Sequence, residues 1–460
     1  MNAVLPRIIK KAQILSGNGD IIWEGNDDEK HKAANILSGF SSSFLKIING
    51  QNNKECIKKI GSGLVFAEAE RLQFITREGC AKGFINMLPR GTLLNRKINN
   101  FNYFLLEKLD AAEFCFPSIY ESKRDSVKNL TEYYEKQGRV FHLTNNEHLC
   151  LSYAADPGIF QLMENKKFID LKLPYTIFSD THYIRNFRSG EINGLNRVRE
   201  FLFPELHTFL AYQDMESYYL KQIELYKKGM EYWFGNDWIY KCDVRASFYN
   251  KNKELFKKMA KLIGMPVYIR ILENIPIYYD IKTQFLIDAG YDFLMIYNMQ
   301  WDTVNSQRFN MKTLSGSPLG IIHGTLAGGC CRLLPSFLGR ALAGIGPQSI
   351  PPQLTEHYLD IILIYESPLI DELVSYLNKE NIIFEIHKTS NLTSIIKKLK
   401  RQRRKWICIV GNRVSKLREI NIQELFTNEN QNIITWVNNT SSYFKCCQNK
   451  EIKFRVDTAW

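Results

Sequence analysis

The sequence predicts an α+β fold, in which an antiparallel sheet with flanking helices is followed by a small α/β domain. Apolar and polar residues alternate through 181–187 and again through 197–201, with two glycines between them, so two antiparallel strands are expected. Apolar residues recur at helical spacing through 221–234. Beyond a proline-containing linker at 347–352, strand and helix patterns alternate, which is typical of a small α/β domain.

Length and charge limit the classes of protein that fit. A chain of 460 residues is long enough for two to four domains that each bury a core. Its 45% apolar and 23% charged residues are ordinary for a globular protein. The net charge of +12 favours an anionic partner such as RNA, although a modest basic excess is also typical of a solvated surface.

The cysteines and the apolar segments indicate the environment of the chain. Its 10 cysteines are scattered, without CxxC pairs, which favours free thiols and a cytoplasmic location. The N-terminus has no long apolar core, so no signal peptide is expected. The least polar segment, 319–346, is interrupted by charged residues and rich in glycine. It predicts a packed helix rather than a membrane span, and no membrane association is expected.

The predicted hairpin carries residues suited to binding phosphate. Arg185 lies on its first strand, and the second strand carries Arg197 and Arg199, with Phe201, Glu205 and His207 close behind. The planar arginine fork binds phosphate in two-point geometry, and a ring beside it can stack on a base. Two interpretations are open: a site for a nucleoside polyphosphate, or a basic hairpin on a solvated sheet face.

The same stretch resembles a known signature. An arginine strand is followed by the pattern SG-x-x-x-GL-x-RVR-x-F and a histidine, here Ser189–Gly190, Gly194–Leu195, Arg197–Arg199, Phe201 and His207. This resembles motif 2 of class II aminoacyl-tRNA synthetases, and specifically the version in threonyl-tRNA synthetases. The resemblance runs from about Arg71 to Val437. It implies the class II antiparallel sheet for a catalytic domain over 71–346, after an N-terminal extension, 1–70, with a helix near 33–48.

A second segment is similar to motif 1 of the same enzymes. Residues 83–91 precede a long amphipathic helix, 92–109, and then a stretch that ends in proline, 111–117. In the family this helix and strand build the dimer interface. The resemblance therefore implies a homodimer.

Residues 323–332 lie where motif 3 should follow. Gly328 and Arg332 match the family pattern, whereas Cys331 replaces a glutamate that helps to hold magnesium in the family. On the motif 2 strand, Phe187 stands where the family has a glutamate. The resemblance implies ATP and Mg²⁺ as cofactors, and these two departures imply either a different ATP pose or weakened activation.

The resemblance also assigns a role to each site residue. The implied catalytic residues are Arg185 and Arg332. Arg185 would bind the α-phosphate and the attacking carboxylate, and Arg332 would bind the γ-phosphate. Arg197, Arg199 and Phe201 would complete the ATP site. The amino acid would meet Glu205 through its ammonium group and would also contact Tyr278 and Gln300.

The family's zinc site is altered in this sequence. Asp156 stands where the family has a cysteine ligand, while the two histidine ligands correspond to His207 and His323. A carboxylate and two imidazoles can bind Zn²⁺ and leave a position open for substrate. The alternative is that the metal has been lost and Asp156 meets the substrate ammonium directly or hydrogen-bonds within its loop.

The segment after the linker resembles the anticodon-binding domain of class IIa synthetases, over 353–437. Strand, helix and strand are expected at 358–365, 369–377 and 382–387, followed by a basic helix at 394–405 and a buried strand at 406–411. The run 397–405 holds seven basic residues in nine, which suits an RNA backbone or a solvated helix face. The tail, 438–460, is uninformative.

Two hypotheses for function follow. In the first, the chain uses ATP to activate a small polar, threonine-like amino acid as an adenylate and transfers it to tRNA or another acceptor. In the second, it is a catalytically idle paralogue that acts as a dimeric nucleic-acid-binding or regulatory subunit. The lost motif acids favour the second, whereas the set of arginines and histidines favours the first.

Overall fold

The structure, a computed structural model, describes most of the chain. The described residues are 8–33, 36–37, 41–49, 60–164, 173–273, 275, 278–345, 358–364, 370–371, 374–375, 383–401, 406–410, 419–424 and 453–457. The expected linker at 347–352, most of the helix expected at 369–377, residues 402–405 and most of the tail lie outside them. The chain divides into two compact units, Met1–Glu70 with Phe74–Pro351, and Arg71–Gln73 with Pro352–Trp460.

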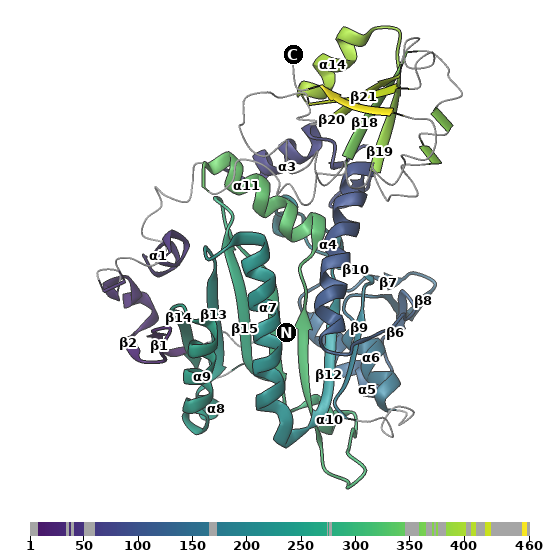
Figure 1. Cartoon of the computed structure of the whole chain (residues 1–460). Helices are drawn as coiled ribbons and strands as arrows, with labels where there is room; N and C mark the ends of the chain where they lie inside the picture. The colour runs from purple at the N-terminus through teal and green to yellow at the C-terminus, as the bar shows by residue number, and fades with distance from the viewer. Residues whose placement is uncertain are drawn as a thin grey trace. The chain divides into compact units, whose positions relative to one another are not determined.

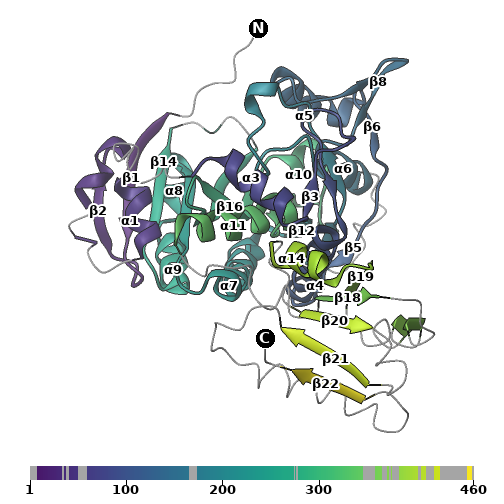
Figure 2. The same ribbon diagram turned by 90° about the horizontal axis from the view of Figure 1, so that it is seen from above.

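A 10-stranded sheet forms the centre of the first unit (Figures 1 and 2). Its order is β2-β1-β14-β13-β15-β16-β17-β12-β9-β5. The strands are β1 (Ile9–Leu15), β2 (Ile21–Gly25), β5 (Ala112–Glu113), β9 (Tyr175–Ser179), β12 (Glu205–Ala211), β13 (Ile239–Arg245), β14 (Val267–Leu272), β15 (Tyr279–Asp288), β16 (Phe293–Asp302) and β17 (Leu319–Thr325). The pairs β13–β14 and β5–β9 are parallel and the other neighbours antiparallel, which confirms the predicted mainly antiparallel sheet.

A long helix lies along one face of this sheet. α7 (Met215–Phe234) confirms the helix expected at 221–234 (Figure 1). Its Tyr219 hydroxyl donates a hydrogen bond to the Thr283 hydroxyl of β15 at 3.2 Å. At Gly324 of β17, a Cβ atom would lie 2.4 Å from the Tyr226 hydroxyl of α7. A side chain at 324 would therefore displace the side chains of α7 that pack on β17.

The opposite face changes character along the sheet. Near β9 and β12 it is covered by α5 (Asp125–Lys136) and α6 (Asp156–Glu164), through an apolar cluster that includes Ile159 and Phe160. Farther along, His323 of β17, Gln300 of β16 and Lys282 of β15 are partners in register and therefore share this face. The first turn of α6 thus lies at the border between an apolar and a polar half.

The other elements of the first unit surround this framework. α4 (Pro89–Glu107) confirms the helix expected at 92–109. The shorter elements are α3 (Ser62–Arg71), α8 (Ala246–Lys251), α9 (Lys253–Ile263), α10 (Asn305–Arg308), the 3₁₀ turns η3 (Ser189–Glu191) and η4 (Tyr212–Asp214), and the strands β3 (Ile75–Thr76), β4 (Asn86–Met87), β6 (Ile119–Glu121), β7 (His142–Leu143), β8 (Asn146–Leu151), β10 (His182–Ile184) and β11 (Glu200–Leu202).

Two strands of the N-terminal extension, β1 and β2, join the sheet, although the sequence predicted no strand there. β1 pairs with β14 and with β2, and the 3₁₀ turn η1 (Asp27–Ala33) and the helix α1 (Ser42–Asn49) follow. Buried Ala12, Ile14 and Phe44 pack with Ile239 and Tyr268 of the sheet. The two lysines in β1 (IKKAQIL) interrupt its apolar pattern, which is why alternation did not reveal this strand.

Residues 319–346 differ from the expected single packed helix. They form β17, then a π-helical turn η5 (Gly329–Leu333) and the helix α11 (Leu334–Ala343). A short buried strand and a buried helix both appear as an apolar run, so periodicity alone does not separate them. Within the described residues, no helix is both long and apolar enough to cross a membrane.

The second unit contains a five-stranded sheet in the order β19-β18-β20-β21-β22. Its elements are β18 (Tyr358–Leu363), β19 (Ile383–Lys388), α14 (Leu392–Arg401), β20 (Trp406–Val410), β21 (Glu419–Glu424) and β22 (Lys453–Asp457). Leu399 of α14 packs against Ile362 and Ile407. The predicted strands near 358, 382 and 406 and the basic helix are confirmed, whereas β21 and β22 were not predicted.

Candidate active site

Three buried side chains meet where α6 begins. Asp156 lies in the first turn of α6, His207 lies on β12, and His323 lies directly opposite His207 on β17. Their ligand atoms all lie within 4.8 Å of one another. Because paired residues of neighbouring strands point to the same face, the sheet register brings the two imidazoles together, and α6 adds the carboxylate.

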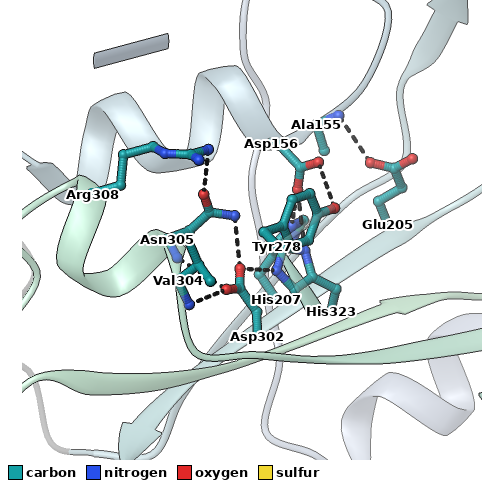
Figure 3. Close-up of polar contacts among 10 residues, drawn as sticks. All are labelled: Ala155, Asp156, Glu205, His207, Tyr278, Asp302, Val304, Asn305, Arg308 and His323. Carbon is teal, nitrogen blue, oxygen red and sulfur yellow. Dashed lines mark hydrogen bonds and ion pairs between the residues drawn. The ribbon is translucent and has the colours of Figure 1, made fainter. Parts of the chain in front are cut away.

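One oxygen of Asp156 serves both imidazoles (Figure 3). Oδ1 of Asp156 lies 2.8 Å from Nε2 of His207 and 3.2 Å from Nδ1 of His323. The other oxygen, Oδ2, accepts a hydrogen bond of 3.3 Å from the Tyr278 hydroxyl. The Tyr278 ring stacks on His323, with 4.9 Å between ring centroids. The structure therefore brings together the three predicted metal ligands and one predicted amino-acid contact.

The charges of this group follow from its contacts. Burial raises the pKa of Asp156, but hydrogen bonds from His207 and His323 outweigh burial and hold it well below its usual range. Burial lowers the pKa of His323, whereas contacts with Asp156 and Asp302 raise it to about 9. For His207, burial dominates and lowers the pKa. Without a metal ion, the group is thus a carboxylate between one charged and one neutral imidazole.

Asp302 at the end of β16 orients His323, a role that the sequence analysis did not predict. Its Oδ2 accepts 2.8 Å and 2.7 Å hydrogen bonds from His323 Nε2 and the Asn305 side chain, and its Oδ1 accepts two backbone N–H groups. The Arg308 guanidinium in turn donates a 3.0 Å hydrogen bond to Oδ1 of Asn305 (Figure 3). Gln300 was predicted from the family resemblance, and strand alternation puts residue 302 on the same face as residue 300, which was the available signal for Asp302.

These residues fit a divalent metal ion. Nε2 of His207, Nδ1 of His323 and Oδ1 of Asp156 face one another, and His323 is held at its other nitrogen by a carboxylate, as metal-bound histidines commonly are. Ligand atoms of a tetrahedral ion with bonds near 2.0–2.2 Å lie roughly 3.3–3.6 Å apart. The two measured separations, 2.8 and 3.2 Å, are slightly shorter, so small side-chain shifts would admit the ion.

Glu205 borders this group on β12. It is buried, and its Oε2 accepts a hydrogen bond of 2.9 Å from the backbone N–H of Ala155, next to Asp156. Burial raises the pKa of Glu205 to about 7, and the negative charge of Asp156 adds to the effect. Gln300 lies opposite His323, and its buried Oε1 has no hydrogen-bond partner among the described residues. Both side chains can therefore receive donors from a ligand.

Arg185 lies between aromatic rings beside Glu205. The pair β10–β11 is antiparallel, as predicted, and the backbone N–H of Arg185 bonds to the Arg199 carbonyl at 2.8 Å. The Arg185 guanidinium lies 5.1 Å from the ring centroid of Phe201 and 5.2 Å from that of Tyr134. Its Nε donates to the Tyr153 carbonyl at 2.9 Å, and its charge lowers the pKa of Glu205. The sequence analysis did not predict either tyrosine.

The other arginines contact different groups. Arg199 donates to the carbonyls of Phe187 and Lys82, at 2.8–3.0 Å. Arg332 donates to the carbonyls of Asn196 and Cys331, at 2.7 and 2.8 Å. These contacts hold backbone segments around the site.

None of the three hairpin arginines lies within a strand, although the sequence had predicted all three there: Arg185 directly follows β10, and Arg199 directly precedes β11. Arg197 lies in the loop between them. Its backbone bridges Asn193, and its exposed guanidinium lies 5.5 Å from the Phe187 ring centroid. The structure thus places Arg185 and Arg199 opposite each other, as expected for one hairpin, and moves Arg197 away from that pair.

The segment that resembles motif 3 supplies no hard ligand at position 331. The buried Cys331 thiol contacts the Leu202 carbonyl at 3.7 Å, and burial raises its pKa. Mg²⁺ prefers oxygen ligands, so a neutral thiol does not fit that role. The same contact places this segment beside the end of β11.

Comparisons with known proteins show which proteins the chain is similar to. No family model matches the chain. It is 23% identical over 363 residues to the threonine–tRNA ligase of Methanosarcina mazei, covering 75% of this chain and 56% of that protein. It is 26% identical over 345 residues to that of Methanobrevibacter smithii, covering 71% and 54%. The chain therefore spans about half the length of these relatives.

Solved structures share the fold. The chain superposes on a structure titled as the RNA-binding domain of threonyl-tRNA synthetase from Cryptosporidium parvum with a TM-score of 0.63 and 16% identity, covering 82% of this chain and 98% of that one. Prolyl-tRNA synthetase of Giardia lamblia gives a TM-score of 0.56 and 14% identity, covering 80% and 74%. These matches confirm the resemblance found in the motifs: the chain is a divergent relative of threonyl-tRNA synthetases with a class II synthetase fold.

Proposed function

We propose that this chain activates a small polar, threonine-like amino acid with ATP, forming an aminoacyl adenylate, and transfers it to tRNA or another acceptor. In the first step, a carboxylate oxygen of the amino acid attacks the α-phosphorus of ATP and pyrophosphate leaves. Two negatively charged groups must approach each other, so the protein acts mainly by positioning and by stabilising charge.

One observation carries the proposal. Glu205 connects the arginine hairpin to the buried Asp156, His207 and His323, because its Oε2 accepts a 2.9 Å hydrogen bond from the backbone N–H of Ala155, next to Asp156, and the charge of Arg185 lowers its pKa. An amino acid whose ammonium group meets Glu205 would thus have its carboxylate near Arg185 and its side chain near the metal-binding group. A basic hairpin on a solvated sheet face would not require a buried carboxylate between its arginine and the metal-binding group.

The remaining residues support the same pose. Tyr278 and Gln300 lie beside His323 and would contact the amino acid. Phe201 would stack on the adenine of ATP. Arg197 and Arg332 would bind its phosphates. ATP would enter as its Mg²⁺ complex. Arg199 would act by holding the hairpin. A Zn²⁺ ion at Asp156, His207 and His323 would supply a Lewis acid for the substrate's amino and side-chain groups.

The acceptor and the assembly are part of the proposal. Lys397, Lys398 and Arg401 are exposed on α14, where they would contact RNA phosphates through charge. The segments that resemble motif 1 would form a homodimer. The proposed acceptor is tRNA or another molecule, and the proposed location is the cytoplasm. Six cysteines among the described residues have free thiols, which agrees with a reducing compartment.

Exchange of labelled pyrophosphate into ATP tests the proposal. The purified full chain is assayed with each of the twenty amino acids, and exchange is expected with threonine or a close analogue. Arg185→Ala should lower the exchange rate at least 100-fold, because it removes a preorganised charge from the transition state. The matched control is Arg188→Ala, an exposed arginine of the same hairpin, which should leave the rate within about twofold.

Absence of exchange with every amino acid, in a folded preparation, would reject the enzyme in favour of the idle binding subunit. Equal rates in the two variants would reject the role of Arg185 alone.

A further inference from the structure

We infer that the carboxylate at position 156 makes this metal site less selective for Zn²⁺ than a site with a thiolate, so that Mn²⁺, Fe²⁺ and Co²⁺ compete for it. The inference deepens the metal site that forms part of the proposed function. It concerns the donor atoms of this chain, and its test measures metal binding rather than activity.

The donor set is two imidazole nitrogens and one carboxylate oxygen. The metal-capable group at this site, within the described residues, consists of Asp156, His207 and His323 and contains no cysteine. Cys150 lies on β8, opposite Tyr120, and the Cys331 thiol contacts the Leu202 carbonyl. No sulfur atom among the described contacts thus replaces the thiolate.

Packing leaves Asp156 a single oxygen for the metal. The Tyr278 hydroxyl holds Oδ2, while Oδ1 faces Nε2 of His207 and Nδ1 of His323. The carboxylate would therefore bind through Oδ1 alone. Its side chain is only 10% exposed, and those of His207 and His323 are 2% and 7% exposed, so the donors have little freedom to rearrange.

The two imidazoles are fixed independently of the metal. Asp302 holds His323 at Nε2, and the Phe160 ring lies edge-on to both imidazoles, with centroids 5.6 and 5.7 Å away. Three fixed donors leave one open position at a tetrahedral ion and three at an octahedral one. The number of donors from the chain therefore does not by itself restrict the site to Zn²⁺.

The chemistry of the donors sets the selectivity. Thiolate ligands are soft and select Zn²⁺ over Mn²⁺, whereas carboxylates also suit the harder ions and two histidines with one carboxylate are a common Fe²⁺ site. By the Irving–Williams order, the site should still bind Zn²⁺ more tightly than Mn²⁺. The difference between Zn²⁺ and Mn²⁺ should nevertheless be smaller here than with a cysteine at position 156.

Metal titration of the full chain tests this inference. The chain is stripped by dialysis against a chelator and titrated with Co²⁺, and one equivalent should produce visible d–d absorption without a thiolate charge-transfer band. Competition then gives the ratio of Zn²⁺ to Mn²⁺ affinity. Asp156→Cys should add the charge-transfer band and raise this ratio at least tenfold. The unmodified chain carries all its own cysteines and so controls for binding to thiols elsewhere.

A second variant separates a ligand from a residue that orients one. Asp302→Asn should weaken binding of every ion by 10–100-fold, while leaving the ratio of Zn²⁺ to Mn²⁺ unchanged. A chain that binds no stoichiometric Co²⁺, or an unchanged ratio in a folded Asp156→Cys variant, would overturn the inference. Pyrophosphate exchange is measured on the same preparations, so loss of metal binding with exchange intact rejects this inference and leaves the proposed function standing.

Discussion

Asp156 shows how one residue can alter a site while the surrounding fold is kept. Its carboxylate contacts His207, His323 and Tyr278. These three contacts set its charge and its hydrogen bonds, and they leave one oxygen facing the imidazoles where a metal ion would bind. The residue types were visible in the sequence. Their convergence was expected from the family resemblance, and the structure supplies the contacts that hold each one.

At the same scale, Glu205 is predicted to bind the ammonium group of the amino acid. Glu205→Gln should raise the KM for the amino acid 10–100-fold with a smaller change in kcat, because a hydrogen bond to a charged partner contributes about 1.5–3 kcal/mol. Amino-acid-dependent pyrophosphate exchange gives both constants. Glu147→Gln, an exposed carboxylate on β8, is the control, and a similar KM in the two variants would refute the assignment.

Gly91 is predicted to be required for the start of α4. A Cβ atom there would lie 2.0 Å from the Phe74 carbonyl oxygen, which is backbone and has little freedom to move. Gly91→Ala should lower the free energy of unfolding by about 1–3 kcal/mol. Gly63→Ala in α3 meets no atom within 4 Å and should be neutral or stabilising. Chemical denaturation of both variants checks this, and equal stabilities would contradict it.

At the scale of elements, Arg185 and Arg199 lie opposite each other directly beyond the ends of the short β10–β11 pair. The sequence predicted this hairpin correctly because alternation and glycines are local signals. It overestimated the strand lengths, since pairing stops where Arg199 turns to the carbonyls of Phe187 and Lys82. The contact with Lys82 joins residues 117 positions apart, and no local pattern reports it.

The hairpin is predicted to lose stability as pH rises. A hydrogen bond to Glu200 raises the pKa of His182 above its ordinary 6.5. A raised pKa means that the folded state holds the proton more tightly, so the stabilisation is complete below pH 6.5 and lost as pH rises through the folded-state pKa. Both side chains are partly exposed, so the effect should stay below about 1 kcal/mol.

Glu200→Gln tests this coupling. NMR titration should show the pKa of His182 falling towards 6.5, and denaturation should show a cost at pH 6 that disappears at pH 9. Glu121→Gln, an exposed carboxylate on β6, should change neither. An unshifted His182 titration in Glu200→Gln would rule out the coupling.

At the scale of the whole molecule, the chain is predicted to be a homodimer through α4 and its neighbours. Phe104 of α4, the helix within the motif 1 resemblance, is 51% exposed, so its ring is accessible to a second copy of the chain. Phe104→Glu should convert dimer to monomer in sedimentation experiments. Leu314→Glu, at a turn residue that is 83% exposed, should leave the dimer intact. A monomeric unmodified chain would contradict the prediction.

The sequence by itself determined the family resemblance, the antiparallel hairpin, the long helices and the candidate metal ligands and arginines of the site. These depend on residue type, spacing and local periodicity, which a single sequence carries. Tertiary structure decided that Asp302 orients His323, that Arg199 holds backbone rather than facing outward, and that β1 and β2 join the main sheet. Each of these depends on contacts between distant segments, where strand register, burial and the need to satisfy buried polar groups act together.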